Sequence, residues 1–130
     1  PYVSGEGSQF GYSVAICKGF AVVGARYDSE VATRAGKIIL FETNNWTIVN
    51  DIKNPNVRSN SSYDYFGTSV FVNDTYYGGS ATGEKASDLV GGSGAVWVYD
   101  IATHTGYFID NPNIGTNQSY DSFGNSTFLF

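Results

Sequence analysis

The chain has 130 residues, a length that suits one ordinary domain, and 42% of them are hydrophobic, so it can fill a core of that size. Its net charge of −5 argues against nucleic acid and against an anionic membrane surface as partners, because both need a basic face. No stretch approaches the roughly 20 apolar residues of a membrane span, so membrane insertion is not expected.

The composition favours strands and tight turns over helices. Only 15% of the residues are charged, whereas Gly, Tyr and Phe number 16, 10 and 9, so an all-β fold is expected. The single cysteine, Cys17, excludes an intrachain disulfide and predicts a buried free thiol. Because the chain begins with Pro1 and contains no Met, we expect it to be a processed product or part of a longer protein.

Periodicity and turn-forming residues divide the first part of the chain into two hairpins. A turn at Lys18 and Gly19 separates the first two strands, and a polar loop over residues 27–35 precedes the second hairpin. The four expected strands cover residues 10–16, 20–25, 36–42 and 46–52.

The second part of the chain has the same order of elements. Its expected strands cover residues 67–72, 75–79, 95–100 and 106–109, with a longer loop over residues 81–92. Apolar residues return at the end of the chain and predict one further strand there.

A long motif shows that the two parts are copies of each other. Residues 54–67 read NPNVRSNSSYDYFG and return 57 residues later, at 111–124, as NPNIGTNQSYDSFG, with nine of fourteen positions identical. A shortened copy of its end, residues 7–11, opens the chain. The sequence therefore predicts a repeat protein. It comprises a loop (1–9), a first repeat (10–65), a second repeat (66–122) and the first strand of a third (123–130).

Residues 10–15 (FGYSVA) and 22–25 (VVGA), followed by Gly36 and an apolar strand, resemble the FG-GAP repeat of integrin-type β-propellers. The second repeat keeps FGTSV at residues 66–70, while Arg26 stands where the family has proline. The resemblance implies four-stranded antiparallel blades, two of them complete, plus the first strand of a third. It also implies an adhesion-type role, so we expect a non-catalytic extracellular structural module.

FG-GAP blades of the integrin type often hold calcium in an acidic loop between their first two strands. The corresponding loops here, residues 17–19 and 73–74, are too short and too poor in carboxylates for the roughly 6–8 oxygens that calcium takes. Asp28 and Glu30, on the loop between the second and third strands, could contribute isolated ligands. No metal site and no cofactor are therefore predicted, although calcium stays open as the one cofactor that isolated carboxylates could bind.

No motif indicates catalysis, so no catalytic residue is assigned and no enzyme is expected. The only histidine, His104, lies in an expected hairpin loop where nothing orients it. Asp64 and Asp121, in the repeated Ser-Tyr-Asp, could be ligands. They are better explained as turn-closing side chains that bond to backbone amides.

Aromatic residues beside Asn and Asp leave carbohydrate binding open as an alternative function. Tyr63 and Tyr120 fall at the same loop position in the two repeats, and with Asp64 and Asp121 they form the candidate ligand-binding set. These tyrosines could instead pack against their own blades, and Trp97, in mid-strand, is expected in the core. The other aromatic candidates are Tyr65, Tyr76, Tyr77, Tyr107 and Trp46.

Asn-X-Ser/Thr sequons occur five times in the chain, where composition alone gives about two. Asn60 and Asn117 stand at the same place in successive repeats, six residues before the Phe-Gly pair. The sequence therefore predicts a secreted glycoprotein. The sequons are Asn45, Asn60, Asn73, Asn117 and Asn125, the last of which falls on the expected final strand.

A propeller needs about 4–8 blades, so two repeats cannot close alone. The strand expected at residues 124–130 would leave an apolar edge unpaired, and such an edge recruits a partner strand or aggregates. We therefore expect it to pair with a copy of the chain, which would give a filament, or with the remainder of a longer chain. Glycans are a further candidate partner.

Overall fold

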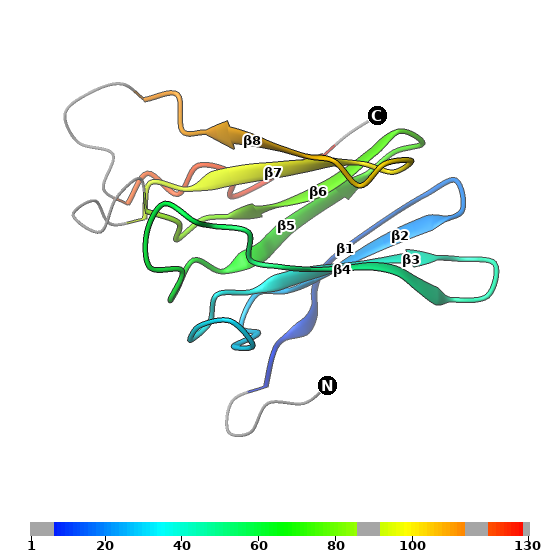
Figure 1. The fold of residues 1–130 in the computed structure, drawn as a ribbon, viewed down its shortest axis with the longest axis horizontal. Coiled ribbons are helices and arrows are strands. Elements are labelled where there is room, and N and C mark those ends of the chain that lie inside the picture. The colour runs from blue at the N-terminus through cyan, green and yellow to red at the C-terminus, as the bar shows by residue number, and fades with distance from the viewer. Residues whose placement is uncertain (1–6, 86–91, 114–119, 129–130) are drawn as a thin grey trace.

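The fold is all-β, as the composition predicted. The computed structural model describes residues 7–85, 92–113 and 120–128, which form two four-stranded antiparallel sheets (Figure 1). None of the described residues forms a helix, so none forms one long and apolar enough to cross a membrane. The two sheets fan out from the adjacent strands β1 and β5, which contact each other along the centre of the molecule.

The first repeat forms one sheet, in which each strand pairs with the next along the chain. Each predicted strand differs from the observed one by at most one residue at an end. The strands are β1 (Phe10–Cys17), β2 (Phe20–Ala25), β3 (Lys37–Glu42) and β4 (Thr47–Lys53), in the order β1-β2-β3-β4.

The second repeat forms the other sheet with the same topology, which confirms the repeat in three dimensions. Its strands are β5 (Phe66–Val72), β6 (Tyr76–Ala81), β7 (Ala95–Asp100) and β8 (Gly106–Asp110), in the order β5-β6-β7-β8. The largest difference from the prediction is that β6 ends two residues later than expected, because Ala81 still pairs with Ala95.

Local turn chemistry explains the first hairpin. Lys18 and Gly19 have φ values of 42° and 90°. A two-residue hairpin loop with two positive φ values matches the right-handed twist of the strands that it connects. The residues Cys17 and Phe20 on either side of this turn are paired, so the turn sets the register of β1 and β2.

The two sheets are joined at a backbone seam. The loop that leads into β5 lies along the loop that precedes β3, and Gly36 pairs with Phe66 in a single parallel bridge. Phe66 N donates to Ala35 O over 2.9 Å. The next seam repeats this arrangement, with a bridge between Gly94 and Phe123 and a 3.1 Å bond from Phe123 N to Ser93 O.

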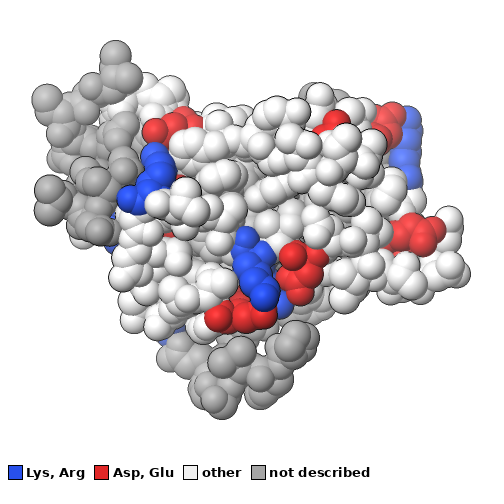
Figure 2. Space-filling model, viewed as in Figure 1, with Lys and Arg blue, Asp and Glu red and all other residues white. Residues whose placement is uncertain are grey.

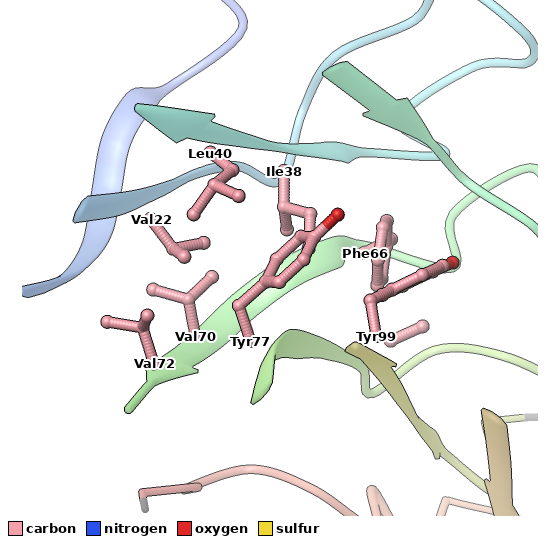
Figure 3. Packing of buried hydrophobic residues seen from close by; sticks show 9 residues of the cluster. Val22, Ile38, Leu40, Phe66, Val70, Val72, Tyr77 and Tyr99 are labelled. Atoms are coloured by element: carbon pink, nitrogen blue, oxygen red, sulfur yellow. The ribbon is translucent and has the colours of Figure 1, made fainter. Parts of the chain in front are cut away.

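The core lies between the sheets. Figure 3 shows Val22, Ile38 and Leu40 of the first sheet pointing toward side chains of the second. Cys17 packs against the edge of this cluster as a half-buried free thiol. Trp97, which was expected in the core, is half-buried beside the cluster, with its ring 4.7 Å from that of Phe108. The second sheet contributes Phe66, Val70, Val72, Tyr77, Ala81 and Tyr99.

The expected first strand of a third repeat does not form in the described part of residues 123–130. Phe123 makes its single bridge, and residues 124–128 adopt turns, bends and irregular backbone. Thr127 lies against β5, where its backbone N donates to Ser69 Oγ over 2.9 Å. The two segments differ in pairing: β1 pairs with β2 along its length, whereas within residues 123–128 only Phe123 makes a bridge.

Gly36→Ala is expected to lower the free energy of unfolding by more than Gly19→Ala does. Both glycines have positive φ values, 86° and 90°, so an alanine costs each about 1 kcal/mol in backbone strain. Only at Gly36 would the new Cβ collide with the backbone of Phe66, whereas at Gly19 nothing lies within 4 Å. Urea denaturation measures the difference, and equal losses would show that the seam tolerates a side chain.

Candidate functional site

The repeated motif of residues 54–67 builds a cluster of hydrogen bonds at the seam. Asn54 Nδ2 donates to Ala35 O over 2.8 Å and to Asp64 Oδ2 over 3.2 Å. Asn56 Nδ2 donates to the same Asp64 oxygen over 2.8 Å, and Asn56 N donates to Asn54 Oδ1. This group, Asn54, Asn56 and Asp64, is called the asparagine clasp below, because it ties the inter-sheet loop to the loop before β3.

The second copy of the motif forms the same clasp with the next seam. Asn111 Nδ2 donates to Ser93 O over 2.9 Å and to Asp121 Oδ2 over 3.0 Å. Asn113 Nδ2 donates to the same oxygen over 2.9 Å. The prediction that Asp64 and Asp121 bond to backbone amides is therefore wrong, since both accept side-chain amides. The signal was present in the sequence, as each Asp follows two asparagines of an Asn-Pro-Asn.

Burial gives the two carboxylates different electrostatics. The Asp64 side chain is fully buried, which raises the pKa of its carboxyl. Its Oδ1 has no hydrogen-bond partner, and Lys85 Nζ lies 3.9 Å from it. Asp121 is exposed, and the amides of Asn113 and Asn111 lower its pKa. The same motif therefore holds a carboxyl with a raised pKa, Asp64, at the first seam and one with a lowered pKa, Asp121, at the second.

A second buried acid links the two sheets. Glu84 is fully buried; its Oε1 lies 2.9 Å from Arg58 Nη2 and its Oε2 accepts a 3.1 Å bond from Trp97 Nε1. Burial raises the pKa of Glu84. Arg58 belongs to the inter-sheet loop, so this ion pair joins that loop to the second sheet.

The acids considered for calcium do not fit that ion. Lys37 Nζ lies 3.7 Å from Asp28 and 3.2 Å from Glu30, and Lys53 Nζ lies 2.7 Å from Glu30. The two carboxylates are therefore engaged by ammonium groups. Asp74, in the short turn after β5, pairs with Lys18 over 3.0 Å. Among the residues that the structure describes, no three His, Cys, Asp or Glu side chains gather in a way that could hold a metal.

Three of the candidate tyrosines meet in one open pocket. Tyr63 and Tyr120, from equivalent positions of the two loops, line it together with Tyr65, and its volume is about 350 Å³. Their rings are accessible, since Tyr63 is 50% and Tyr120 is 83% exposed. We call this the tyrosine pocket. The other lining residues are Thr82, Gly83, Lys85, Gly92 and Ser122.

The remaining candidate aromatic residues lie elsewhere. Tyr76 and Tyr107 are exposed on strands of the second sheet, and Trp46 is exposed on the β3–β4 turn. Tyr77 is buried in the core, where its hydroxyl accepts a 2.9 Å bond from Asn50 Nδ2.

His104 is not as isolated as its loop position suggested. It is exposed, but its Nδ1 lies 2.9 Å from the hydroxyl of Tyr77. The hydroxyl therefore orients the imidazole, contrary to the expectation from sequence. The contact joins an exposed histidine to the hydroxyl of a phenol ring that is buried in the core.

The sequons lie at the surface where the structure describes them. Asn45, Asn60 and Asn125 are exposed, Asn73 is half-buried, and Asn117 lies outside the described residues. Asn125 is therefore not in a buried strand, as its position had suggested. The Oδ1 of Asn60 accepts a 2.8 Å bond from Ser62 N, which is a local side-chain turn.

Asp64→Asn is expected to keep the clasp, because an amide oxygen can accept both asparagine donors. Asp64→Ala would remove one acceptor from each of the two amides, which keep only Ala35 O and Ser59 Oγ, at about 1–3 kcal/mol for each donor left unpaired. The raised pKa of Asp64 means that its ionisation disfavours the folded state as the pH rises through that pKa. Urea denaturation should therefore show wild type losing stability relative to Asp64→Asn between pH 4 and pH 7, and a gain would contradict the burial argument.

A family model described as an FG-GAP repeat matches residues 4–41, which end within β3. No curated protein matches the chain. The second sheet repeats the strand order, the seam and the clasp of the first, so the motif is present twice in the structure. The chain therefore contains an FG-GAP repeat, and its two sheets have the topology of β-propeller-type blades.

Proposed function

We propose that this protein is a non-catalytic extracellular structural module of adhesion type, whose blades pack side by side in a larger β-propeller or a filament. The observation that carries the proposal concerns the two surfaces that pack against each other between the sheets. Each outer face of the chain carries apolar residues at the same repeat positions as one of these two surfaces. The first blade is the first sheet and the second blade is the second sheet.

The outer face of the first blade is made of residues whose counterparts are buried in the second. Val70 and Val72 of β5 face the first blade and are 6% and 5% exposed. Their counterparts on β1, Val14 and Ile16, are 62% and 66% exposed. The first blade therefore presents to solvent the apolar surface that the second blade buries against its neighbour.

The outer face of the second blade is the counterpart of the other half of that interface. Val96 and Val98 of β7 stand where Ile38 and Leu40 stand on β3, each two and four residues after the seam glycine. They line a hollow of about 330 Å³ with Phe71 and Phe128, and Phe128 is 73% exposed. A further blade of the same kind would bury both outer faces as the closed interface does.

The surface charge is compatible with packing of this kind. Figure 2 shows a face on which charged side chains form small groups of mixed sign, separated by wide uncharged areas. Apolar area removed from water stabilises association by about 25 cal/mol per Å², and few charges need to be desolvated. We propose that residues 124–130 complete their strand when a copy of the chain, or a further part of a longer one, supplies a pairing strand.

Val14→Asp is expected to abolish association of the chain with copies of itself, because it places a charge on the outer apolar face, where the counterpart Val70 is buried in the closed interface. Val57→Asp is the matched control, since Val57 is 91% exposed on the inter-sheet loop. Sedimentation velocity over a range of concentrations should show wild type and Val57→Asp associating and Val14→Asp remaining monomeric. A wild-type chain that stays monomeric throughout would contradict self-association.

Extracellular location and N-glycosylation are part of the proposal. The exposure of Asn45, Asn60 and Asn125 supports it, because an attached glycan must remain in water. Asn60 Oδ1 also accepts a hydrogen bond from the backbone N of Ser62, the third residue of the same sequon.

Protein secreted by its native source is expected to lose mass on treatment with an N-glycosidase. Asn60→Gln should remove one glycan and leave the free energy of unfolding of the deglycosylated protein, from urea denaturation, within about 0.5 kcal/mol of wild type, as for other exposed sites. Intact-mass spectrometry gives the result. A mass equal to that of the bare chain before treatment would refute glycosylation.

A second candidate function is carbohydrate binding, and the tyrosine pocket favours it. The pocket brings together Tyr63 and Tyr120 from different repeats. Their flat aromatic rings are the kind of surface on which a sugar ring can pack. Asp64 and Asp121 are not among the residues that line the pocket, and the Oδ2 atom of each accepts two side-chain amides of its clasp.

A further inference from the structure

The first blade fills with side chains the place where the second blade has the tyrosine pocket. In the first blade the Tyr27 ring lies 5.6 Å from the Tyr65 ring. The Arg34 guanidinium lies 4.4 Å above Tyr27 and that of Arg26 lies 4.8 Å above it. These four residues form one continuous stack, called the first-blade stack below.

All four positions of this stack carry smaller residues in the second blade. Backbone hydrogen bonds fix the correspondence: Tyr65 N donates to Arg34 O over 3.1 Å, and Ser122 N donates to Gly92 O over 3.0 Å. The counterparts of Arg26, Tyr27, Arg34 and Tyr65 are Thr82, Gly83, Gly92 and Ser122, and all four line the tyrosine pocket. The tyrosine pocket therefore occupies the place in the second blade that the side chains of the stack fill in the first blade.

We propose that the tyrosine pocket binds one neutral sugar ring, seated where the first blade places its Tyr27 ring. This proposal deepens the carbohydrate-binding candidate above by assigning its site and ligand class. The rings of Tyr65 and Tyr120 offer apolar surfaces, and the hydroxyls of Thr82 and Ser122 offer hydrogen bonds to a hydroxylated ring.

The charges of the pocket argue for a neutral ligand. Among the described residues that line it, Lys85 is the only charged one. Its ammonium already donates to Ser62 O over 3.1 Å and to Asn60 O over 3.4 Å, and Asp64 lies 3.9 Å away. An anionic sugar would have to compete with these partners, whereas a neutral one would not.

Gly92 gives a way to refill the pocket without disturbing the backbone. Its φ of 45° is close to the 51° of Arg34, so the chain already carries an arginine in that conformation at the equivalent position. A Cβ at Gly92 would meet Tyr120 Cα at 3.6 Å, an ordinary contact. By contrast, a Cβ at Gly83 would collide with the Tyr63 carbonyl.

The test titrates the 130-residue chain with the methyl glycosides of glucose, galactose, mannose and N-acetylglucosamine, and with p-cresol, by saturation-transfer NMR. We expect at least one glycoside to bind wild type and to lose at least about tenfold in affinity, or 1.4 kcal/mol, in Gly92→Arg. Gly92→Ala is the matched control, because it adds the same backbone strain without filling the pocket, and it should bind as wild type does. Ser122→Tyr, which copies Tyr65 into its counterpart, should weaken binding as Gly92→Arg does and serves if the arginine variant does not fold.

Four results would overturn the proposal. If no glycoside binds wild type, the ligand class is wrong. If glycosides bind Gly92→Arg and Ser122→Tyr as well as wild type, the protein binds sugars but not in this pocket, and the carbohydrate function survives. If only p-cresol binds, the pocket accepts an aromatic side chain instead of a sugar. An equal loss in Gly92→Ala would assign the effect to the backbone.

Discussion

Two backbone segments approach each other at the seam so closely that a side chain between them would collide with the chain, and the rest of the structure depends on this contact. Gly36 makes the approach sterically possible, and the asparagine clasp holds it, because Asn54 bonds at once to Ala35 O and to Asp64. The seam sets the distance between the sheets, so it also sets which side chains of β3 and β5 share the core. Packing between the blades follows from hydrogen bonds that lie outside both sheets.

The strands could be predicted closely because their signals are local. Alternation and turn residues such as Lys18 and Gly19 act over a few positions, and both repeats carry them. The motif of residues 54–67 could be recognised as a repeat, but its role could not be assigned, because Asn54 acts on Ala35, which is distant in sequence. The final strand was predicted because the repeat begins again at Phe123, but residues 124–128 do not form it, since a strand also needs a partner to pair with.

The site was only partly visible from the sequence. Tyr63 and Tyr120 could be selected because they repeat, and the structure does bring them together. Gly83 and Gly92 could not be selected, since a glycine gives no sign of which side chain is missing beside it. The difference between the blades becomes informative only when both backbones are superposed by their hydrogen bonds. Repetition in sequence thus points to shared architecture, and departures from repetition point to the individual role of one blade.

The two buried acids Asp28 and Glu84 occupy equivalent positions but receive their counter-charges from different places. Lys37, on the next strand of the same blade, accompanies Asp28, whereas Arg58 reaches Glu84 from the loop that precedes the second blade. The segment that contains both Glu84 and its counter-charge therefore begins before the second sequence repeat, in the loop that carries Arg58. Excising or transplanting the second blade at the start of β5 would leave the buried Glu84 without its cationic partner, so a cut upstream of Arg58 is needed to keep this ion pair.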